Sequence, residues 1–390
     1  MDSPNLSDTA AVDRARALGP AVAAAAASIE RQRRLPEPLL TQLYGSRLLR
    51  MLLPHAAGGD QIEPGAYLLA VEEIARHDAS VGWLVFVANS AALIAAFLDE
   101  AVARTIFADP RTVIAWGPPN ASRAVAVAGG YRVSGRWSFA SGCRHANWMG
   151  AHCHVTEADG SLRRNRLGHP TIRTLLFPAD AATLIDTWDV IGLRGTASDS
   201  YSVTELFVPE AFTTTREDPA LRRERGPLYA FTMQGLYATG VAGVALGTAR
   251  AMLDAFIELA ARKSPRGLDR LADSAVVQAE VGRAEAKLAA ARAYLFETLA
   301  SIYAGADAIE PIAVADRARV RLAAVNAIHA AVDVAYVCYR AAGVDAIFVG
   351  SPYERRFRDI HTLSQQIQSR AAHFEAVGQI LLGQPPELFF

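Results

Sequence analysis

The densest group of reactive side chains in the sequence lies between positions 143 and 154. It combines two thiols with three imidazoles: Cys143, His145, His152, Cys153 and His154. Zinc sites use such groups, but they usually present them as close pairs from turns. In a strand, His152 and His154 would share one face while Cys153 points to the other, and no acidic residue lies among them. We therefore predict no metal here, and expect these side chains to pack in the interior or to line a site.

A second polar group lies near the C-terminus, within a segment whose pattern predicts one long helix over Ser351–Leu382. On such a helix His361 and Gln365 share one face, and Gln366, Arg370 and His373 share the neighbouring face. An imidazole at this position has the chemistry of a general acid or base. A single histidine on a helix is also commonly structural, so both interpretations stay open at this point.

The motifs of several large enzyme classes are missing from the sequence. No Gly-x-Gly-x-x-Gly follows a strand-like segment, and no Walker-type loop, Gly-x-Ser-x-Gly elbow or His-Glu-x-x-His is present. Gly240, Gly243 and Gly247 lie in an Ala- and Val-rich helical segment, where their spacing indicates close contact with another helix. We therefore predict that the chain has no nicotinamide-binding domain.

Composition narrows the choice of class further. Thirty-nine basic and forty acidic side chains give a net charge of -1, which excludes the basic footprint of a nucleic-acid-binding protein. Three cysteines without a Cys-x-x-Cys spacing favour a reducing compartment and buried thiols, so we expect a cytoplasmic protein. The uncharged stretch Ala79–Leu98 is long enough to span a bilayer, but acidic residues flank it. We predict a buried helix there and no membrane span.

The periodicity divides the 390 residues into three regions. Residues 1–111 have helical patterning, residues 112–215 have the alternation of strands, and residues 216–390 contain four long helical segments. In the middle region, Arg123–Ala128 and Tyr131–Phe139 flank a Gly-Gly dipeptide that suits a tight hairpin. The expected fold is α+β and mostly α: an N-terminal helical domain, a central antiparallel β domain and a C-terminal four-helix bundle.

Four segments of the sequence carry a resemblance to a known family. The segment SGRWSFASGC at 134–143, followed by His145 and Trp148, looks like the sheet-domain signature of flavin-dependent monooxygenases with the acyl-CoA dehydrogenase fold. WDVIGLRGT at 188–196 resembles the next block of that family. DASVGW at 78–83 and RDIHT at 358–362 are similar to its helical motifs and are less specific. The resemblance covers most of the chain from about Ala66.

The resemblance implies an enzyme of a particular kind. Members of this branch are homotetramers that take reduced flavin, FMN or FAD, from a separate reductase and carry no nicotinamide site. Reduced flavin and dioxygen form a flavin hydroperoxide, and the protein must keep water from eliminating peroxide. Relatives hydroxylate phenols and polyketide or steroid-derived aromatics, or oxidise indoles, sulfides and amines. We therefore expect a small aromatic or amine-type substrate.

The resemblance also assigns roles to individual residues. Ser141 occupies the position whose counterpart contacts flavin N5, and it is expected to take part in catalysis by retaining the N5 proton. The flavin ring is expected to lie against Trp116, Phe139, Ala140 and Trp188. The flavin phosphate needs cations, for which the candidates are Arg262, Arg266 and Arg370. The expected substrate-binding residues are Trp83, Asn89, His145, Gln365 and Gln366. Of these, Trp83 and Asn89 are expected from their place on the long apolar helix, where core packing is an equal alternative. The alternative is a strand end with a satisfied serine and ordinary core aromatics.

One departure from the family pattern bears on the chemistry. Many relatives have a histidine five residues after the equivalent of His361, and here that position is Gln366. Activation of a phenol is therefore in doubt. Either His361 serves as the catalytic acid or base, or the substrate is already nucleophilic, as an amine or an indole is.

Two other functions remain to be weighed against the monooxygenase. An acyl-CoA dehydrogenase-type enzyme on the same fold needs a carboxylate base, but the segment 358–373 offers only Asp359, which we expect to pair with Arg355. A flavin-binding scaffold without chemistry has Gln366 as its only support. Fold alone does not separate these functions.

Overall fold

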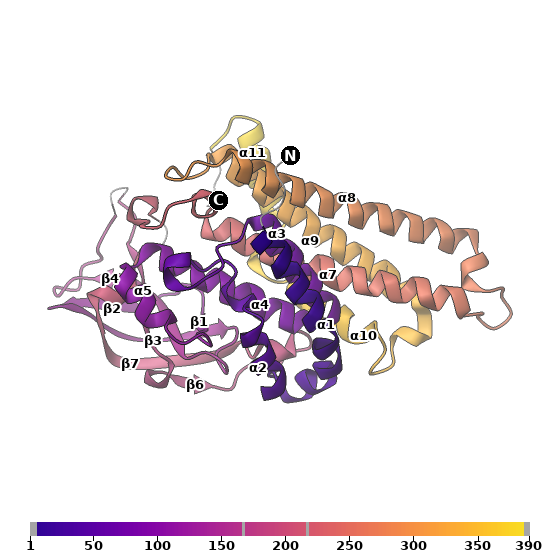
Figure 1. Ribbon diagram of the computed structural model, residues 1–390, viewed down its shortest axis with the longest axis horizontal. Coiled ribbons are helices and arrows are strands. Elements are labelled where there is room, and N and C mark those ends of the chain that lie inside the picture. Colours follow the sequence, from indigo (N-terminus) through magenta and orange to yellow (C-terminus); the bar gives the residue numbers. More distant parts are fainter. Residues whose placement is uncertain (1–5, 166–167, 216–217, 386–390) are drawn as a thin grey trace.

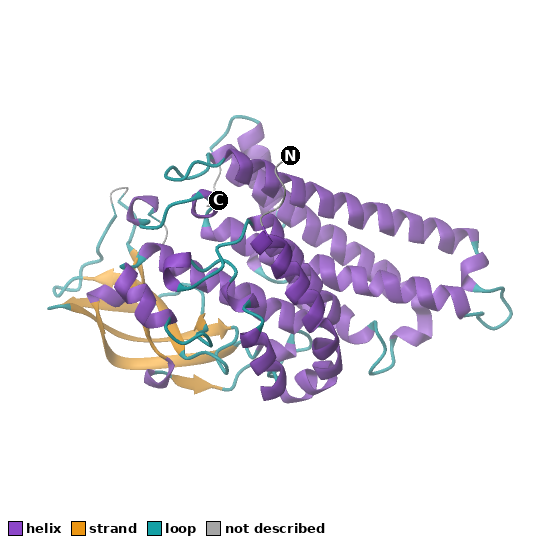
Figure 2. Cartoon of the chain, viewed as in Figure 1, coloured by secondary structure: helices purple, strands orange, loops and turns teal. Residues whose placement is uncertain are grey.

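The computed structural model describes residues 6–165, 168–215 and 218–385. A block of strands lies between two groups of helices along the chain. In space the sheet occupies one end of the molecule and the longest helices extend away from it (Figure 1). Helices predominate over strands (Figure 2), which confirms the predicted α+β, mostly α class. The two boundaries between the three predicted domains stay a prediction. The one after residue 215 adjoins residues 216–217, which lie outside the described part of the chain.

The first helical group packs between the sheet and the long helices (Figure 1). Its members are α1 (Leu6–Gln32), α2 (Glu37–Gly45), α3 (Pro64–His77), α4 (Ala79–Ala92) and α5 (Glu100–Phe107). The Asp78 carboxylate begins α4 by accepting the backbone N–H groups of Ser80 at 2.9 Å and Val81 at 3.1 Å. Helix α4 ends at Ala92 and a 3-10 turn continues to Phe97, so the predicted buried helix is present but changes its winding.

Among the described residues, three helical segments are long and apolar enough to cross a membrane by length and composition alone. They are Ala79–Phe97, Met233–Arg262 and Val314–Ala346. The most apolar window of each is buried inside the fold to 89%, 72% and 56%, respectively. Contact with other protein segments therefore accounts for the apolar character of the first segment in particular.

The described strands form one mixed sheet. They are β1 (Ile114–Trp116), β2 (Arg123–Val127), β3 (Gly130–Ala140), β4 (Trp148–Thr156), β5 (Ile172–Pro178), β6 (Thr183–Ile185), β7 (Asp199–Pro209) and β8 (Thr213–Thr214). The order is β6-β7-β3-β2-β4-β5-β8, and β1 pairs with β4. The predicted β2–β3 hairpin is present, and Gly129 in its turn has φ +79°.

The prediction of a wholly antiparallel sheet was wrong. Both β1 and β2 run parallel to β4, β1 beside its first half and β2 beside its second half. A long connection separates each of these pairs in sequence, which parallel pairing requires. The alternation of side chains is the same in both kinds of pairing, so the sequence pattern did not distinguish them.

The second helical group contains the long bundle helices. Its members are α6 (Pro227–Ala230), α7 (Met233–Arg262), α8 (Ala275–Gly305), α9 (Val314–Ala342), α10 (Glu354–Leu363) and α11 (Ala372–Leu381). The predicted close contact at the α7 glycines is confirmed. A Cβ atom on Gly240 would lie 2.6 Å from the Tyr67 hydroxyl, and one on Gly247 would lie 2.2 Å from the Glu72 carbonyl oxygen, so α7 packs directly on the backbone of α3.

The prediction of one continuous fourth bundle helix was also wrong. The chain leaves the helix at Ser364 and re-enters one at Ala372, with a 3-10 turn over 367–369 between them. Gln366 adopts an extended backbone, φ -71° and ψ 148°, and its side chain accepts the N–H of Gln368 at 2.6 Å. Side-chain bonds of this kind compete with the helical ladder. Residues 364–371 contain no Gly or Pro, so nothing in the sequence indicated that the helix is interrupted there.

Candidate active site

A cavity of about 640 Å³ lies where the sheet meets both helical groups. Its walls come from α4, from β1, β3 and β4, from the 188–198 loop, from the start of α7 and from the broken segment 362–370. Its volume is within the usual range of roughly 300–1,000 Å³ for small-molecule and cofactor sites. The lining is largely apolar, with hydroxyl and amide groups at a few positions.

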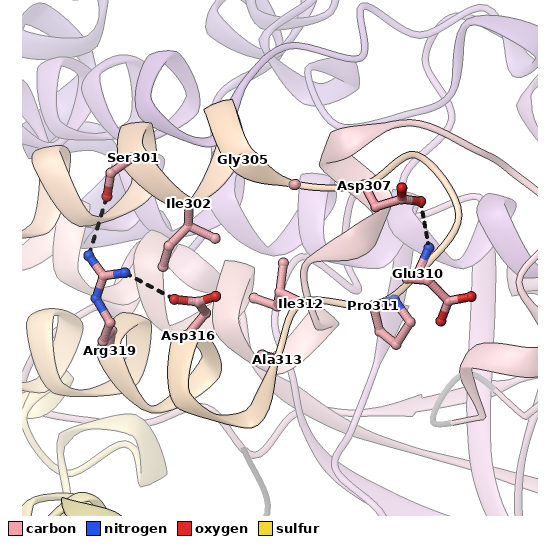
Figure 3. Close-up of a pocket in the computed structure, with 11 residues that line it drawn as sticks. Ser301, Ile302, Gly305, Asp307, Glu310, Pro311, Ile312, Ala313, Asp316 and Arg319 are labelled. Atoms are coloured by element: carbon pink, nitrogen blue, oxygen red, sulfur yellow. Dashed lines mark hydrogen bonds and ion pairs between the residues drawn. The ribbon is translucent and has the colours of Figure 1, made fainter.

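A second hollow, of about 280 Å³, lies between the end of α8 and the start of α9. Several of its polar groups bond to one another, as Figure 3 shows. Arg319 lies 3.0 Å from Asp316 and 3.4 Å from the Ser301 hydroxyl, and Asp307 accepts the backbone N–H of Glu310 at 3.0 Å. Because these groups already have partners within the hollow, we take the larger cavity as the candidate site.

Two aromatic side chains form one wall of the large cavity. The pairing of β3 with β7 shifts register between Trp137 and Ala140, and at this irregularity Phe139 takes φ 62°. Such a bulge re-aims a side chain. The Phe139 ring is 63% exposed and lies 6.2 Å from the Trp188 ring, edge to face. Trp116 also lines the cavity, whereas Ala140 is fully buried beside it. An exposed aromatic face of this size is suited to stacking against a flat ring.

Trp188 is held in place by Asp199 at the start of β7. The carboxylate accepts the backbone N–H groups of Thr187 and Trp188, each at 2.9 Å, and pairs with Arg144 at 2.6 Å. Burial alone would raise the pKa of Asp199, but the hydrogen bonds from Arg144 and from the two amides bring it below its ordinary value. The loop that carries Trp188 is therefore anchored to the sheet by an ionised, fully bonded carboxylate.

Ser141 lies directly after β3 and faces the cavity. Its hydroxyl accepts the indole N–H of Trp83 at 3.0 Å and lies 2.7 Å from the Ser198 hydroxyl. Three predicted site residues, Ser141, Trp83 and Phe139, thus come together at one end of the cavity.

The broken segment 362–370 forms another wall, where Gln365, Gln366 and Arg370 line the cavity. Gln366 uses its carbonyl oxygen to bond the Gln368 N–H, so its amide NH₂ group is what it offers to a bound molecule. Gln368 is buried and donates to Gln234 at 3.0 Å. Arg370 is exposed at the edge of the cavity.

Two predicted substrate-binding residues lie outside the cavity and have structural roles. Asn89 is fully buried, accepts the N–H of Leu52 at 2.9 Å, and donates to the carbonyls of Leu48 and Val85 at 2.7 and 2.8 Å. His145 accepts the N–H of Leu35 at 3.1 Å. Burial, together with nearby arginines, lowers the pKa of His145 to about 4, so the imidazole stays neutral. Both side chains satisfy backbone groups, and the prediction that they contact substrate does not fit these positions.

His361, the predicted acid or base, does not line the cavity either. Its ring lies 4.2 Å from the Phe357 ring on α10, and burial lowers its pKa. The next residue, Thr362, is the one that reaches the cavity wall. The expected pairing of Asp359 with Arg355 is also replaced: Arg355 lies 3.7 Å from Asp78, and Asp359 accepts the Leu193 N–H at 2.6 Å.

The two predicted phosphate ligands on the first bundle helix lie far from the cavity of their own chain. Tyr237 near the start of α7 lines the cavity, whereas Arg262 ends the helix and Arg266 follows it. At about 1.5 Å per residue, Arg262 is about 38 Å from Tyr237 along the helix. Both arginines are exposed. Arg370 is therefore the predicted phosphate ligand that the fold places at this cavity.

The thiol and imidazole group of the sequence is spread over separate environments. Cys143 donates to the Ala197 carbonyl at 3.2 Å, and burial raises its pKa to about 12. His152 lines the cavity, with Nδ1 2.8 Å from the Thr174 hydroxyl and its ring 5.0 Å from that of Trp116. Within the described residues, no three His, Cys, Asp or Glu side chains gather as metal ligands do.

The sequence analysis missed several residues that line the cavity, among them Thr196, Ser198, Gln234 and Tyr237. Thr196 ends the family-like block at 188–196 and Ser198 follows it, and their alternation with Ala197 was the available signal. Gln234 and Tyr237 begin α7, where nothing in the pattern separates a lining residue from an ordinary first turn.

The chemistry of the cavity fits a flat, redox-active ring better than an acyl thioester. Its aromatic wall offers stacking surface, and Ser141 offers a hydroxyl beside it. None of the described residues that line it is an aspartate or a glutamate, so the carboxylate base of a dehydrogenase has no candidate on its walls.

Comparison with known proteins agrees with the fold and the cavity. Residues 9–108 match the acyl-CoA dehydrogenase N-terminal domain, and residues 239–370 match the acyl-CoA dehydrogenase C-terminal domain. XiaF from Streptomyces sp., solved with FADH2 and glycerol, superimposes with a TM-score of 0.90 at 24% identity, covering 98% of this chain and 97% of that one. The fold and site thus define a protein of acyl-CoA dehydrogenase architecture.

Sequence relatives narrow the class. The chain is 30% identical over 366 residues to an indole-3-acetate monooxygenase of Pseudomonas putida, covering 92% of this chain and 90% of the relative. It is 26% identical to HsaA, the oxygenase subunit of a flavin-dependent monooxygenase of Rhodococcus jostii, over 90% of this chain and 92% of the relative. The chain therefore belongs to the flavin-dependent monooxygenases of the acyl-CoA dehydrogenase fold, as predicted, and is an oxidoreductase.

Proposed function

We propose that this protein is the oxygenase component of a two-component system that transfers one oxygen atom from dioxygen to a small aromatic substrate. A separate reductase supplies the reduced flavin, FMN or FAD. The observation that carries the proposal is a cavity with Ser141 beside the exposed Phe139 face and without a carboxylate among the described lining residues. The names of the relatives, one an oxygenase subunit, support the division of labour between two proteins.

The bound flavin would supply the activation of dioxygen, and the chain's residues would position and shelter it. Phe139, Trp188 and Trp116 would flank the ring system. Ser141 would face flavin N5, and Arg370 would approach the phosphate as a charge-assisted donor. The apolar remainder of the wall would exclude water from the reacting atoms.

The substrate we propose is an aromatic whose ring is already electron-rich, with indoles as the leading class. The matched Pseudomonas putida relative is named for indole-3-acetate. Gln366 stands where many relatives have a histidine, and its amide is neutral at all relevant pH values. Because a neutral amide cannot remove a proton from the substrate, we expect a substrate that reacts without being deprotonated. The amides of Gln365 and Gln366 would orient its polar groups.

We further propose a homotetramer in which Arg262 and Arg266 serve a neighbouring subunit's flavin phosphate. Their exposure and their distance from the chain's own cavity support this arrangement. Light scattering should give four chains per particle. Arg266→Gln should weaken flavin binding without lowering the melting temperature, and unchanged flavin affinity would exclude this role for Arg266.

The decisive experiment mixes the protein and anaerobically reduced flavin with oxygenated buffer in a stopped-flow instrument. A transient absorbance distinct from those of reduced and oxidised flavin, followed by an oxygenated product when indole-3-acetate is present, supports the monooxygenase. Bleaching of bound oxidised flavin by an acyl-CoA would select a dehydrogenase instead. Absence of both responses and of flavin binding would leave a scaffold without chemistry.

A further inference from the structure

Three hydroxyl groups form a continuous hydrogen-bonded chain along the cavity wall. The Ser141 hydroxyl lies 2.7 Å from that of Ser198, which lies 2.7 Å from that of Thr196. The Thr196 hydroxyl then donates to the backbone carbonyl of Leu193 at 2.9 Å. All three hydroxyl residues line the cavity, and Trp83 donates to the Ser141 end at 3.0 Å.

Proton counting fixes the direction of this chain. Each hydroxyl has one proton, and a carbonyl oxygen can only accept. Thr196 therefore gives its proton to Leu193, Ser198 gives its proton to Thr196, and Ser141 gives its proton to Ser198. Because an indole N–H only donates, Trp83 occupies one lone pair of Ser141. The only hydrogen-bonding capacity that Ser141 still offers to the cavity is therefore one lone pair, which can accept but cannot donate.

The opposite direction is electrostatically unfavourable. If Thr196 donated to Ser198, its oxygen and the Leu193 carbonyl oxygen would face each other at 2.9 Å without a proton between them. The carbonyl is fixed in place by the Trp188 indole N–H at 3.0 Å, and Asp359 holds the Leu193 amide at 2.6 Å. Leu193 and Ala197 both have positive φ, 52° and 46°. Such conformations cost energy outside glycine and persist where the surroundings fix them.

We propose that Thr196 and Ser198 are positioning residues that make Ser141 an obligate hydrogen-bond acceptor, so that the site selects reduced over oxidised flavin. The inference rests on the proposed function, in which Ser141 faces flavin N5. Reduced flavin carries a hydrogen on N5 and can donate it to Ser141. In oxidised flavin, N5 carries no hydrogen and is itself an acceptor, so its lone pair would face the lone pair of Ser141 without a proton between them. The chain thereby favours binding of the form that a reductase delivers and release of the spent form.

The test compares dissociation constants of the full-length protein for reduced and oxidised FMN and FAD, measured anaerobically and aerobically by fluorescence titration. The wild type should bind the reduced form at least tenfold more tightly. For a two-electron couple, each tenfold preference raises the potential of the bound flavin by about 30 mV. Potentiometry of the bound flavin gives the same ratio independently of turnover.

Two variants release the Ser141 proton toward the cavity by different routes. In Thr196→Val, Ser198 loses its acceptor and turns to Ser141, while the Leu193 carbonyl keeps the Trp188 indole and Thr196 backbone donors. In Ser198→Ala, Ser141 loses its own acceptor. Each should reduce the preference for reduced flavin about tenfold, and Thr196→Ser, which retains the hydroxyl, should restore it.

Ser200→Ala is the matched control. Ser200 lies on β7, two residues after Ser198, is buried, and joins a separate group of three hydroxyls by donating to Ser138 at 2.9 Å and accepting from Thr187 at 3.0 Å. It should leave the preference unchanged. If Thr196→Val or Ser198→Ala binds flavin with the wild-type ratio, the proposal is wrong while the proposed function stands. If the wild type binds neither form, the proposed function itself fails.

Discussion

The indole N–H of Trp83 on α4 donates to the Ser141 hydroxyl at the end of β3 across 3.0 Å, although the two residues are 58 positions apart. The contact joins the first helical group to the sheet at the cavity itself. The orientation of the one serine expected to meet the flavin therefore depends in part on a helix of the N-terminal group, whose DASVGW segment ends at Trp83.

Ser141→Ala is expected to uncouple oxygen consumption from product formation. The lost hydrogen bond has a net value of about 0.5–1.5 kcal/mol, or about two- to tenfold in the lifetime of the oxygen-activated state. The measurement is the fraction of consumed oxygen that appears as hydrogen peroxide. Ser134→Ala on β3, which removes the acceptor of the Glu205 backbone N–H on β7, serves as control and should leave that fraction unchanged.

His361→Ala is expected to lower the free energy of unfolding by about 1 kcal/mol while changing turnover less than twofold. The ring contributes a contact with Phe357 at 4.2 Å and does not line the cavity. Urea denaturation and steady-state product formation test the two parts. Turnover reduced tenfold with unchanged stability would restore the catalytic role that the sequence suggested.

Asp359 should make the protein less stable as the pH rises. Burial, and next the charge of Asp78, raise its pKa from 3.8 to about 7, so the folded state holds this proton more tightly than the unfolded state. The contribution to stability is complete below about pH 4 and is lost as the pH approaches 7. Asp359→Asn retains an acceptor for the Leu193 N–H. Its urea midpoint should rise relative to wild type between pH 5 and pH 8, and parallel pH profiles would contradict this assignment.

Gly247→Ala should destabilise the protein by about 1–3 kcal/mol, because the added methyl group overlaps the Glu72 carbonyl oxygen. Gly282→Ala on α8 is the control. Its methyl group meets no atom within 4 Å, and the substitution should stabilise the helix by about 0.5–1 kcal/mol. Thermal unfolding of the two variants checks both signs. Equal shifts would show that α7 and α3 are not in backbone contact.

Much of the fold could be predicted because it depends on local periodicity. The β2–β3 hairpin follows from its glycines and its alternating side chains, and the α7 glycines indicate a helix contact by their spacing. The parallel pairing of β1 and β2 with β4 could not be predicted, since partner direction leaves no trace in alternation. The break after Leu363 depends on one glutamine bonding the backbone two residues ahead.

The candidate site was predicted where a motif fixes both identity and orientation. Ser141, Phe139 and Trp188 line the cavity as expected: the bulge in β3 directs Phe139, and Asp199 anchors the loop that carries Trp188. His361 was proposed as the acid or base because Gln366 stands where many relatives have a histidine, but its side chain packs against Phe357 within α10. Asn89 was proposed from its place on the long apolar helix and His145 from the thiol and imidazole group, but backbone groups use the hydrogen-bonding capacity of both side chains. Sequence does not show which polar side chains already have partners.

Because of the interruption between α10 and α11, part of the cavity wall is formed by residues outside the regular bundle helices. Substituting a residue inside a regular helix changes a face whose neighbours recur every turn, whereas residues 365–370 belong to a short irregular stretch. Exchanges at its exposed positions, Gln365 and Ile367, can change the cavity wall while the buried Gln368 keeps its bond to Gln234 on α7 and the Ser369 carbonyl keeps its bond to His329 on α9. Substitutions at these two exposed positions can therefore alter what the cavity accepts at low cost to stability.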